Sequence, residues 1–84
     1  MKNYSEIAKE VIELMATSLG ANASAITEES IIADLSRDSI QLFELLLAFE
    51  KAYEVETAYE DVVKMHTVRD VIEYVSRIKY GIVE

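Results

Sequence analysis

The sequence contains no cysteine and no proline, and it has one histidine and two glycines among its 84 residues. Without cysteine the chain has no disulfide bond and no thiolate ligand for a metal, and a single histidine does not make a His-rich site. With no proline and two glycines, the chain has few residues that interrupt helices. Stability must therefore come from packing around one core, and the length allows a single domain over residues 1–84.

Basic residues are also scarce, because eight Lys and Arg stand against sixteen Asp and Glu, for a formal charge of −8. This charge disfavours binding to nucleic acid or to anionic membrane surfaces, since like charges repel. Apolar residues never run unbroken for long, and residues 1–10 have no stretch typical of a signal peptide. We therefore expect a soluble, cytoplasmic, monomeric protein that neither binds nucleic acid nor inserts into a membrane.

Apolar residues recur mostly every three or four positions, which predicts an all-α chain. A first helix over residues 4–19 is predicted by such a stripe, by Asn3 and Glu6 in the positions of a capping box, and by Gly20 at the end. Residues 21–38 are predicted to form a long loop. Four apolar side chains should hold this loop over the core: Ile26, Ile31, Ile32 and Leu35.

A second helix is predicted from Ser39 to about Glu54, with Asp38 as its cap and Gln41 where a capping-box partner belongs. At about 100° per residue, one sector of this helix is apolar and should face the core. Its members are Leu42, Leu45, Leu46, Phe49, Ala52 and Tyr53. Three further apolar residues fall on the opposite side, among charged side chains: Ile40, Phe43 and Leu47.

Two shorter patterns follow. A short third helix is predicted over residues 59–64, although it lacks a strong cap. A fourth begins after Thr67, which forms a cap signature with Asp70. Its buried stripe should consist of Val68, Val71, Ile72, Val75 and Ile78.

The apolar residues on the outer side of the second helix have two interpretations. In one, the long loop or the third helix covers them and buries at least one. In the other, they form an exposed strip rimmed by acidic side chains, which suits a transient docking surface. We favour the second, because side chains of this size are not expected on a surface without a use.

Ser39 is predicted to begin a helix, where unpaired N–H groups and the helix dipole favour an attached anion such as a phosphodiester. The same residue type is common at helix starts without any such role. The pattern around it, however, resembles the acyl carrier protein family, whose attachment site is an Asp-Ser-Leu motif that opens the second helix. Here Asp38-Ser39-Ile40 stands in that place. Further matches in order and spacing are Ala33-Asp34-Leu35, Glu44-Leu45, Ala48-Phe49-Glu50 and Thr67-Val68.

The resemblance implies a four-helix bundle with a long packed loop after the first helix and a short third helix. It implies that a phosphopantetheinyl transferase attaches 4′-phosphopantetheine to Ser39, next to Asp38, and that the arm carries acyl groups as thioesters for fatty acid, polyketide or related synthesis. The chain itself would not be an enzyme. Acyl-transferring and acyl-processing enzymes would contact the second helix, at the family's usual positions: Ile40, Phe43, Glu44 and Leu47.

The chain departs from the family pattern near this motif. Ser36 replaces a usual glycine, Gln41 replaces a frequent acidic residue, and Thr57-Ala58 replaces an Ile-Pro pair. The last two departures predict a specialised partner set. Arg37 is either solvated or paired with the phosphate of the arm.

Other functions are weaker. The main rival is an acidic helical binding or inhibitor module without the prosthetic group. A peptidyl carrier usually has Gly-Gly before its motif, unlike Leu35-Ser36-Arg37. His66 has no partner at a catalytic spacing, and Glu28-Glu29 and Glu60-Asp61 lack the alternating ligands of a calcium loop.

Overall fold

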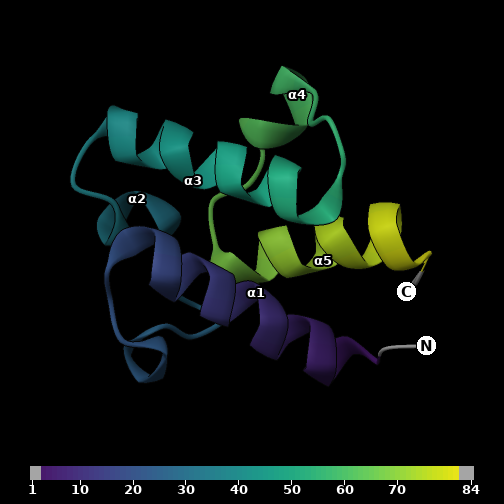
Figure 1. Cartoon of the computed structure of the whole chain (residues 1–84), viewed down its shortest axis with the longest axis horizontal. Coiled ribbons are helices and arrows are strands. Elements are labelled where there is room, and N and C mark those ends of the chain that lie inside the picture. Colours follow the sequence, from purple (N-terminus) through teal and green to yellow (C-terminus); the bar gives the residue numbers. More distant parts are fainter. Residues whose placement is uncertain (1–2, 82–84) are drawn as a thin grey trace.

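The computed structural model describes residues 3–81, over which the chain forms three long helices and several short ones (Figure 1). The long helices are α1 (Tyr4–Leu19), α3 (Ser39–Tyr53) and α5 (Val68–Tyr80). The short elements are the 3₁₀ turn η1 (Ala23–Ala25), α2 (Ile32–Leu35) and α4 (Tyr59–Val62). The all-α prediction is therefore confirmed.

Each long helix begins directly after a residue whose side chain caps it. The capping boxes predicted at Asn3–Glu6 and Thr67–Asp70 are both present, so that in each the side chains of the two residues bond each other's backbone N–H. Helix α1 ends at Gly20, whose φ of +69° lies in the left-handed region that glycine adopts without strain. Local sequence thus determined the ends of α1 and the start of α5.

The loop between α1 and α3 is held by a second segment, the turn before α5. Three backbone N–H groups donate across this junction: Ile32 to His66 O at 2.9 Å, Val68 to Ser30 O at 3.0 Å and Arg69 to Glu28 O at 2.9 Å. The Arg69 guanidinium adds ion pairs to Glu28 and Glu29. These two acidic residues, which lack the ligand pattern of a calcium loop, therefore pair with an arginine.

The core lies between α1, α3 and α5, where α1 packs against both of the other long helices (Figure 1). The rings of Phe49 and Tyr53 stack with centroids 6.1 Å apart and place two aromatic side chains in this core. The residues that are almost completely buried are Ile7, Val11, Met15, Val68 and Ile72. Burial of these side chains supplies the main force that holds the three helices together.

The predicted core face of α3 is confirmed at Leu45, Phe49 and Tyr53, but its edge is rotated from the real one. Leu42 is 38% exposed and Ala52 is also exposed, whereas Gln41, which was not assigned to the core, is only 7% exposed. An assignment of helix faces from apolar residues alone puts a glutamine on the solvent-facing side. It lies inside here because its amide oxygen accepts a backbone hydrogen bond, which offsets the cost of burial.

Other differences from the sequence predictions are local. Ile31 and Ile78 are more than one-third exposed, so neither is the core contact that its spacing suggested. Ile31 instead forms an isolated bridge with Thr67. The third helix is α4, which ends at Val62 rather than Lys64, and the loop contains an additional helical turn, α2. A four-residue helix has too few positions for an apolar period to be recognised.

Candidate functional site

Ser39 is the first residue of α3 and is exposed. Asp38 precedes it as the cap, and its Oδ1 accepts a hydrogen bond from Gln41 N–H at 2.9 Å. Two other backbone N–H groups at this end of α3 remain free. Within residues 3–81, the amides of Ser39 and Ile40 make no hydrogen bond to the protein. The Ser39 hydroxyl thus stands in solvent at the positive end of a helix.

The turn into Ser39 is held by Gln41 in a way that the sequence did not predict. Its side-chain Oε1 accepts a hydrogen bond from Arg37 N–H at 2.6 Å, rather than from the N–H of the capping residue Asp38. The side chain of Gln41 is buried while that of Arg37 is exposed. The backbone on both sides of Ser39 is therefore anchored, although Ser39 itself is uncovered.

Ser36 also departs from the glycine typical of this position, and its backbone explains why a side chain is tolerated. Its φ of −91° is ordinary for any residue. The Ser36 hydroxyl lies 3.4 Å from Ile32 O and 3.5 Å from Ala33 O, within α2. It is therefore directed back into its own turn rather than toward solvent at the start of α3.

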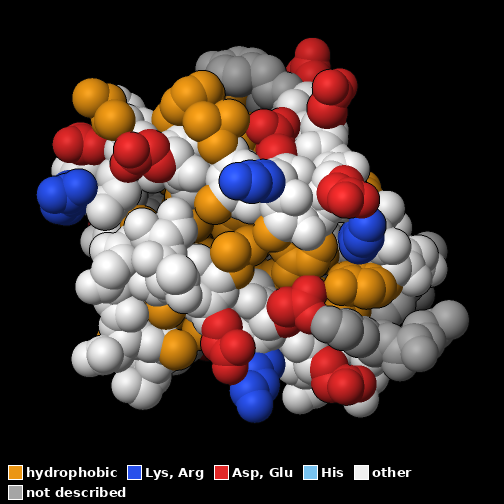
Figure 2. Space-filling view, in the orientation of Figure 1, with side chains coloured by type: hydrophobic (Ala, Val, Ile, Leu, Met, Phe, Trp, Pro, Cys, Tyr) orange, Lys and Arg blue, Asp and Glu red, His pale blue; other side chains and the backbone are white. Residues whose placement is uncertain are grey.

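Ile40, Phe43 and Leu47, here called the outer strip, are exposed by 70%, 58% and 47%. The interpretation in which the loop or the third helix buries one of them is therefore wrong. Figure 2 shows hydrophobic side chains next to acidic and basic ones over the region where Figure 1 places α3. Leu42, which was expected in the core, adds to the apolar surface of this helix.

Glu50 lies near the end of α3, and its carboxylate is held toward Thr57 by two hydrogen bonds. Its Oε2 accepts hydrogen bonds from Thr57 N–H at 2.9 Å and from the Thr57 hydroxyl at 3.0 Å. Thr57, which replaces an apolar residue of the family pattern, thus binds the segment between α3 and α4 to the end of α3. The sequence contained the two residues, but their pairing depends on the turn that brings them together.

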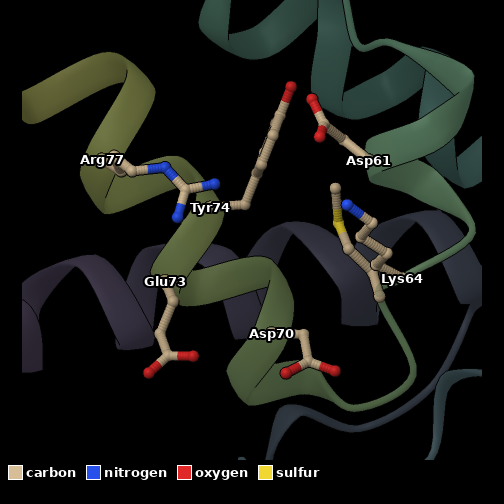
Figure 3. Close-up of a pocket in the computed structure, with 7 residues that line it drawn as sticks. Asp61, Lys64, Asp70, Glu73, Tyr74 and Arg77 are labelled. Atoms are coloured by element: carbon tan, nitrogen blue, oxygen red, sulfur yellow. The ribbon is translucent and has the colours of Figure 1, made fainter.

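A hollow on another part of the surface lies between α4 and α5 (Figure 3). It is lined by Asp61, Lys64, Met65, Asp70, Glu73, Tyr74 and Arg77. Backbone N–H groups of His66 and Thr67 donate to Asp70 and lower the pKa of its carboxyl group. Asp70 is therefore engaged as a helix cap, and His66 is an exposed loop residue whose carbonyl accepts from Ile32.

The structure contains neither a metal cluster nor a membrane helix in its described part. Over residues 3–81, no group of three or more His, Cys, Asp or Glu side chains is arranged to hold a metal ion. None of the helices in this range has both the length and the apolar composition needed to cross a bilayer.

Comparisons with known proteins agree with the motif around Ser39. A family model described as "Phosphopantetheine attachment site" matches residues 9–75, a range that includes α3 and most of α1 and α5. The acyl carrier protein of Syntrophobacter fumaroxidans (strain DSM 10017 / MPOB) is 34% identical over 70 residues, which cover 82% of this chain and 86% of that protein. The chain therefore belongs to the acyl carrier protein family, whose members are not enzymes but carry acyl groups on a covalently attached 4′-phosphopantetheine.

Proposed function

We propose that Ser39 is the residue that carries 4′-phosphopantetheine and that the outer strip of α3 is where partner enzymes dock. The exposure of Ser39 at the first position of a 15-residue helix is the observation that supports this most directly. A bulky group attached to its oxygen would displace no core side chain. The free N–H groups of Ser39 and Ile40 would face the negative charge of a phosphodiester.

In the proposed attachment step, the Ser39 oxygen attacks the phosphorus that bears the pantetheine portion of coenzyme A. A new O–P bond forms, the bond to the second phosphorus of the diphosphate breaks, and adenosine 3′,5′-bisphosphate leaves. The hydroxyl proton passes to a base of the phosphopantetheinyl transferase, since this chain has no basic group hydrogen-bonded to Ser39 within residues 3–81. When attached, the group supplies the thiol on which acyl groups are held as thioesters.

Asp38 acts here through the backbone. By accepting from Gln41 N–H it fixes the first turn of α3, and so holds Ser39 where a partner can reach it. Arg37 lies at the same end of the helix without an ion pair in the described part of the chain. Ile40, Phe43, Glu44 and Leu47 would form the contact surface, because they are exposed and follow Ser39 on the same helix.

The proposed partners are a phosphopantetheinyl transferase and a dedicated set of acyl-transferring and acyl-processing enzymes, in a specialised pathway. This specialisation is supported by the small number of acidic charges at the start of α3, where Gln41 is buried and Arg37 is exposed. We further propose that the protein works as a monomer in the cytoplasm, because a charge of −8 keeps copies of the chain apart.

Co-expression with a broad-specificity phosphopantetheinyl transferase tests the attachment site by intact mass. The wild-type chain should gain one phosphopantetheinyl group, and Ser39→Ala should gain none while unfolding within about 1 kcal/mol of wild type. Ser36→Ala is the matched control, because it removes the nearest other hydroxyl and should still be modified. Failure of the wild type to gain mass would favour the rival function, an acidic binding module without the prosthetic group.

A further inference from the structure

The segment that contains α4 adds little to the core. Over residues 54–65, here called the flap, none of the described side chains is buried, whereas α1, α3 and α5 each contribute several core residues. Val55 and Met65 pack partly against the core, and Val63 is 48% exposed. In Figure 1, α4 lies at the edge of the molecule, beyond the three long helices. The described apolar contacts between the flap and the core are therefore made near its two ends.

The hydrogen bonds that join the flap to the rest of the described chain all end at Glu50. Its backbone carbonyl accepts from the N–H groups of Glu54 and Val55, which complete the last turn of α3. Its carboxylate accepts from the N–H and the hydroxyl of Thr57, at 2.9 and 3.0 Å. The other described backbone hydrogen bonds of the flap join residues within it. Beyond the end of α3, the flap is thus held by the bonds of one carboxylate.

The flap begins at a residue whose backbone conformation is unfavourable. Glu54 has a φ of +54°, and it is the one non-glycine residue with a positive φ in the described part of the chain. Helices α1 and α5 also end in the left-handed region, but at Gly20 and Gly81. A side chain makes this conformation less stable than it is for glycine. The connection through which the flap leaves α3 is therefore strained, as hinge residues can be.

The flap forms one wall of the hollow between α4 and α5, and Tyr74 lies on the opposite wall (Figure 3). Tyr74 is 9% exposed, and burial, followed by the charge of Asp61 on the flap, raises the pKa of its hydroxyl. Within residues 3–81, no ion pair joins the flap to α5. Movement of the flap would thus widen the hollow and expose Tyr74 without breaking an ion pair.

We propose that residues 54–65 open as one unit, with Glu54 as the hinge and the Glu50 carboxylate as the latch, while α1, α3 and α5 stay packed. The long helices keep their buried residues when the flap moves, because the described flap contributes none of them. Segments with few buried apolar contacts open at a lower free energy than the whole domain. The strain at Glu54 favours opening, and the two bonds to Thr57 oppose it.

Amide hydrogen exchange of the full chain, followed by NMR, tests this proposal. Four flap amides donate described hydrogen bonds and report opening: Thr57, Val62, Lys64 and Met65. Their protection factors should agree within about threefold, because one opening exposes all four. They should also be at least about tenfold below those of the central amides of α1 and α5, which the same opening leaves protected.

Glu50→Ala removes the latch and should lower all four protection factors by a common factor of about ten or more, since both bonds from Thr57 are lost. Glu50→Gln retains an acceptor oxygen and should restore most of the protection. Glu44→Ala is the matched control, because Glu44 is an exposed acidic residue of α3 that makes no ion pair within residues 3–81. This control should leave the flap unchanged.

Glu54→Gly tests the hinge separately. Glycine adopts the left-handed conformation without strain, so the closed flap should become more stable and all four protection factors should rise together. Unchanged protection in this variant would exclude Glu54 as the hinge.

An effect of Glu50→Ala confined to Thr57 would overturn the proposal, because the latch would not then hold a unit. So would unequal protection among the four wild-type amides, or protection equal to that of α1 and α5. The wild-type measurement decides this point without any variant, and circular dichroism melts establish that each variant is folded. Attachment of phosphopantetheine to Ser39 is measured separately by mass, so the two proposals can fail independently.

Discussion

The side chain of Gln41 accepts a hydrogen bond from the backbone N–H of Arg37 at 2.6 Å, and this bond closes the turn that contains Ser39. Gln41 lies within the first turn of α3 and Arg37 precedes its cap, so the bond joins the loop to the helix. The attachment residue proposed here is thus exposed on a backbone that is held from both sides.

Replacing Gln41 with Leu should loosen this turn. The variant places an apolar side chain of similar size in the buried position of Gln41 but leaves Arg37 N–H without its acceptor, at a cost of about 1 to 2 kcal/mol in unfolding free energy. Transfer of phosphopantetheine to Ser39 should also slow. Gln41→Glu is the control, because it retains an acceptor oxygen, and equal transfer rates for the two variants would contradict a role for this bond.

Truncation of Phe49 should be severe. The side chain is buried in the core and stacks on Tyr53, so Phe49→Ala should lower the unfolding free energy by about 3 to 5 kcal/mol and can unfold so small a domain. Thermal and urea unfolding followed by circular dichroism measure the loss. A melting temperature near that of wild type would be incompatible with the core described here.

Charge and apolar contact on α3 should contribute differently to docking. Glu44→Lys should slow association with the phosphopantetheinyl transferase, and this defect should disappear at high salt, because exposed charges act mainly by steering. Leu47→Ala should speed dissociation at every salt concentration, since an apolar anchor holds the formed complex. Transfer kinetics across a salt series separate the two effects.

Thermal melts provide the control for that pair of variants. Leu47 is 47% exposed, so its truncation should change the unfolding free energy by less than about 1 kcal/mol. A loss of about 2 to 5 kcal/mol, typical of a core leucine, would show that Leu47 is buried and that the outer strip does not include it.

Asp70 should make stability depend on acid pH. Hydrogen bonds from the N–H groups of His66 and Thr67 lower the pKa of its carboxyl group in the folded state. Its contribution is therefore complete at pH values above the unfolded pKa of about 4 and is lost as the pH falls through the lower folded value. Asp70→Asn should be less stable than wild type at neutral pH, and the difference should shrink in acid; a difference independent of pH would exclude this linkage.

Two buried hydroxyl groups should be dispensable. The Tyr53 hydroxyl and the Ser76 hydroxyl have no hydrogen-bond partner within the described chain, and burial is the main cause that raises the pKa of Tyr53 to about 12. Because a buried, unpaired polar group is costly, Tyr53→Phe and Ser76→Ala should each raise the unfolding free energy by about 1 to 3 kcal/mol. Lower melting temperatures for both variants would indicate that these groups are satisfied in solution.

Much of the fold followed from local sequence. Capping residues such as Asn3 and Thr67 bond groups within one helical turn, so their role is readable without knowing the rest of the chain. The long apolar periods of α1 and α5 determined which sides face the core, and the residues around Ser39 determined the family. The proposed attachment residue and the outer strip were also predicted from local sequence.

Tertiary structure decided the features in which distant residues meet or a polar residue is buried. The rotation of α3 depends on Gln41, whose burial is possible only because the incoming loop presents Arg37 N–H to it. The pairing of Glu28 and Glu29 with Arg69 requires the loop to cross to the start of α5. Apolar periodicity contains no information on such partners, because the free energy of a buried polar group is set by what surrounds it in space.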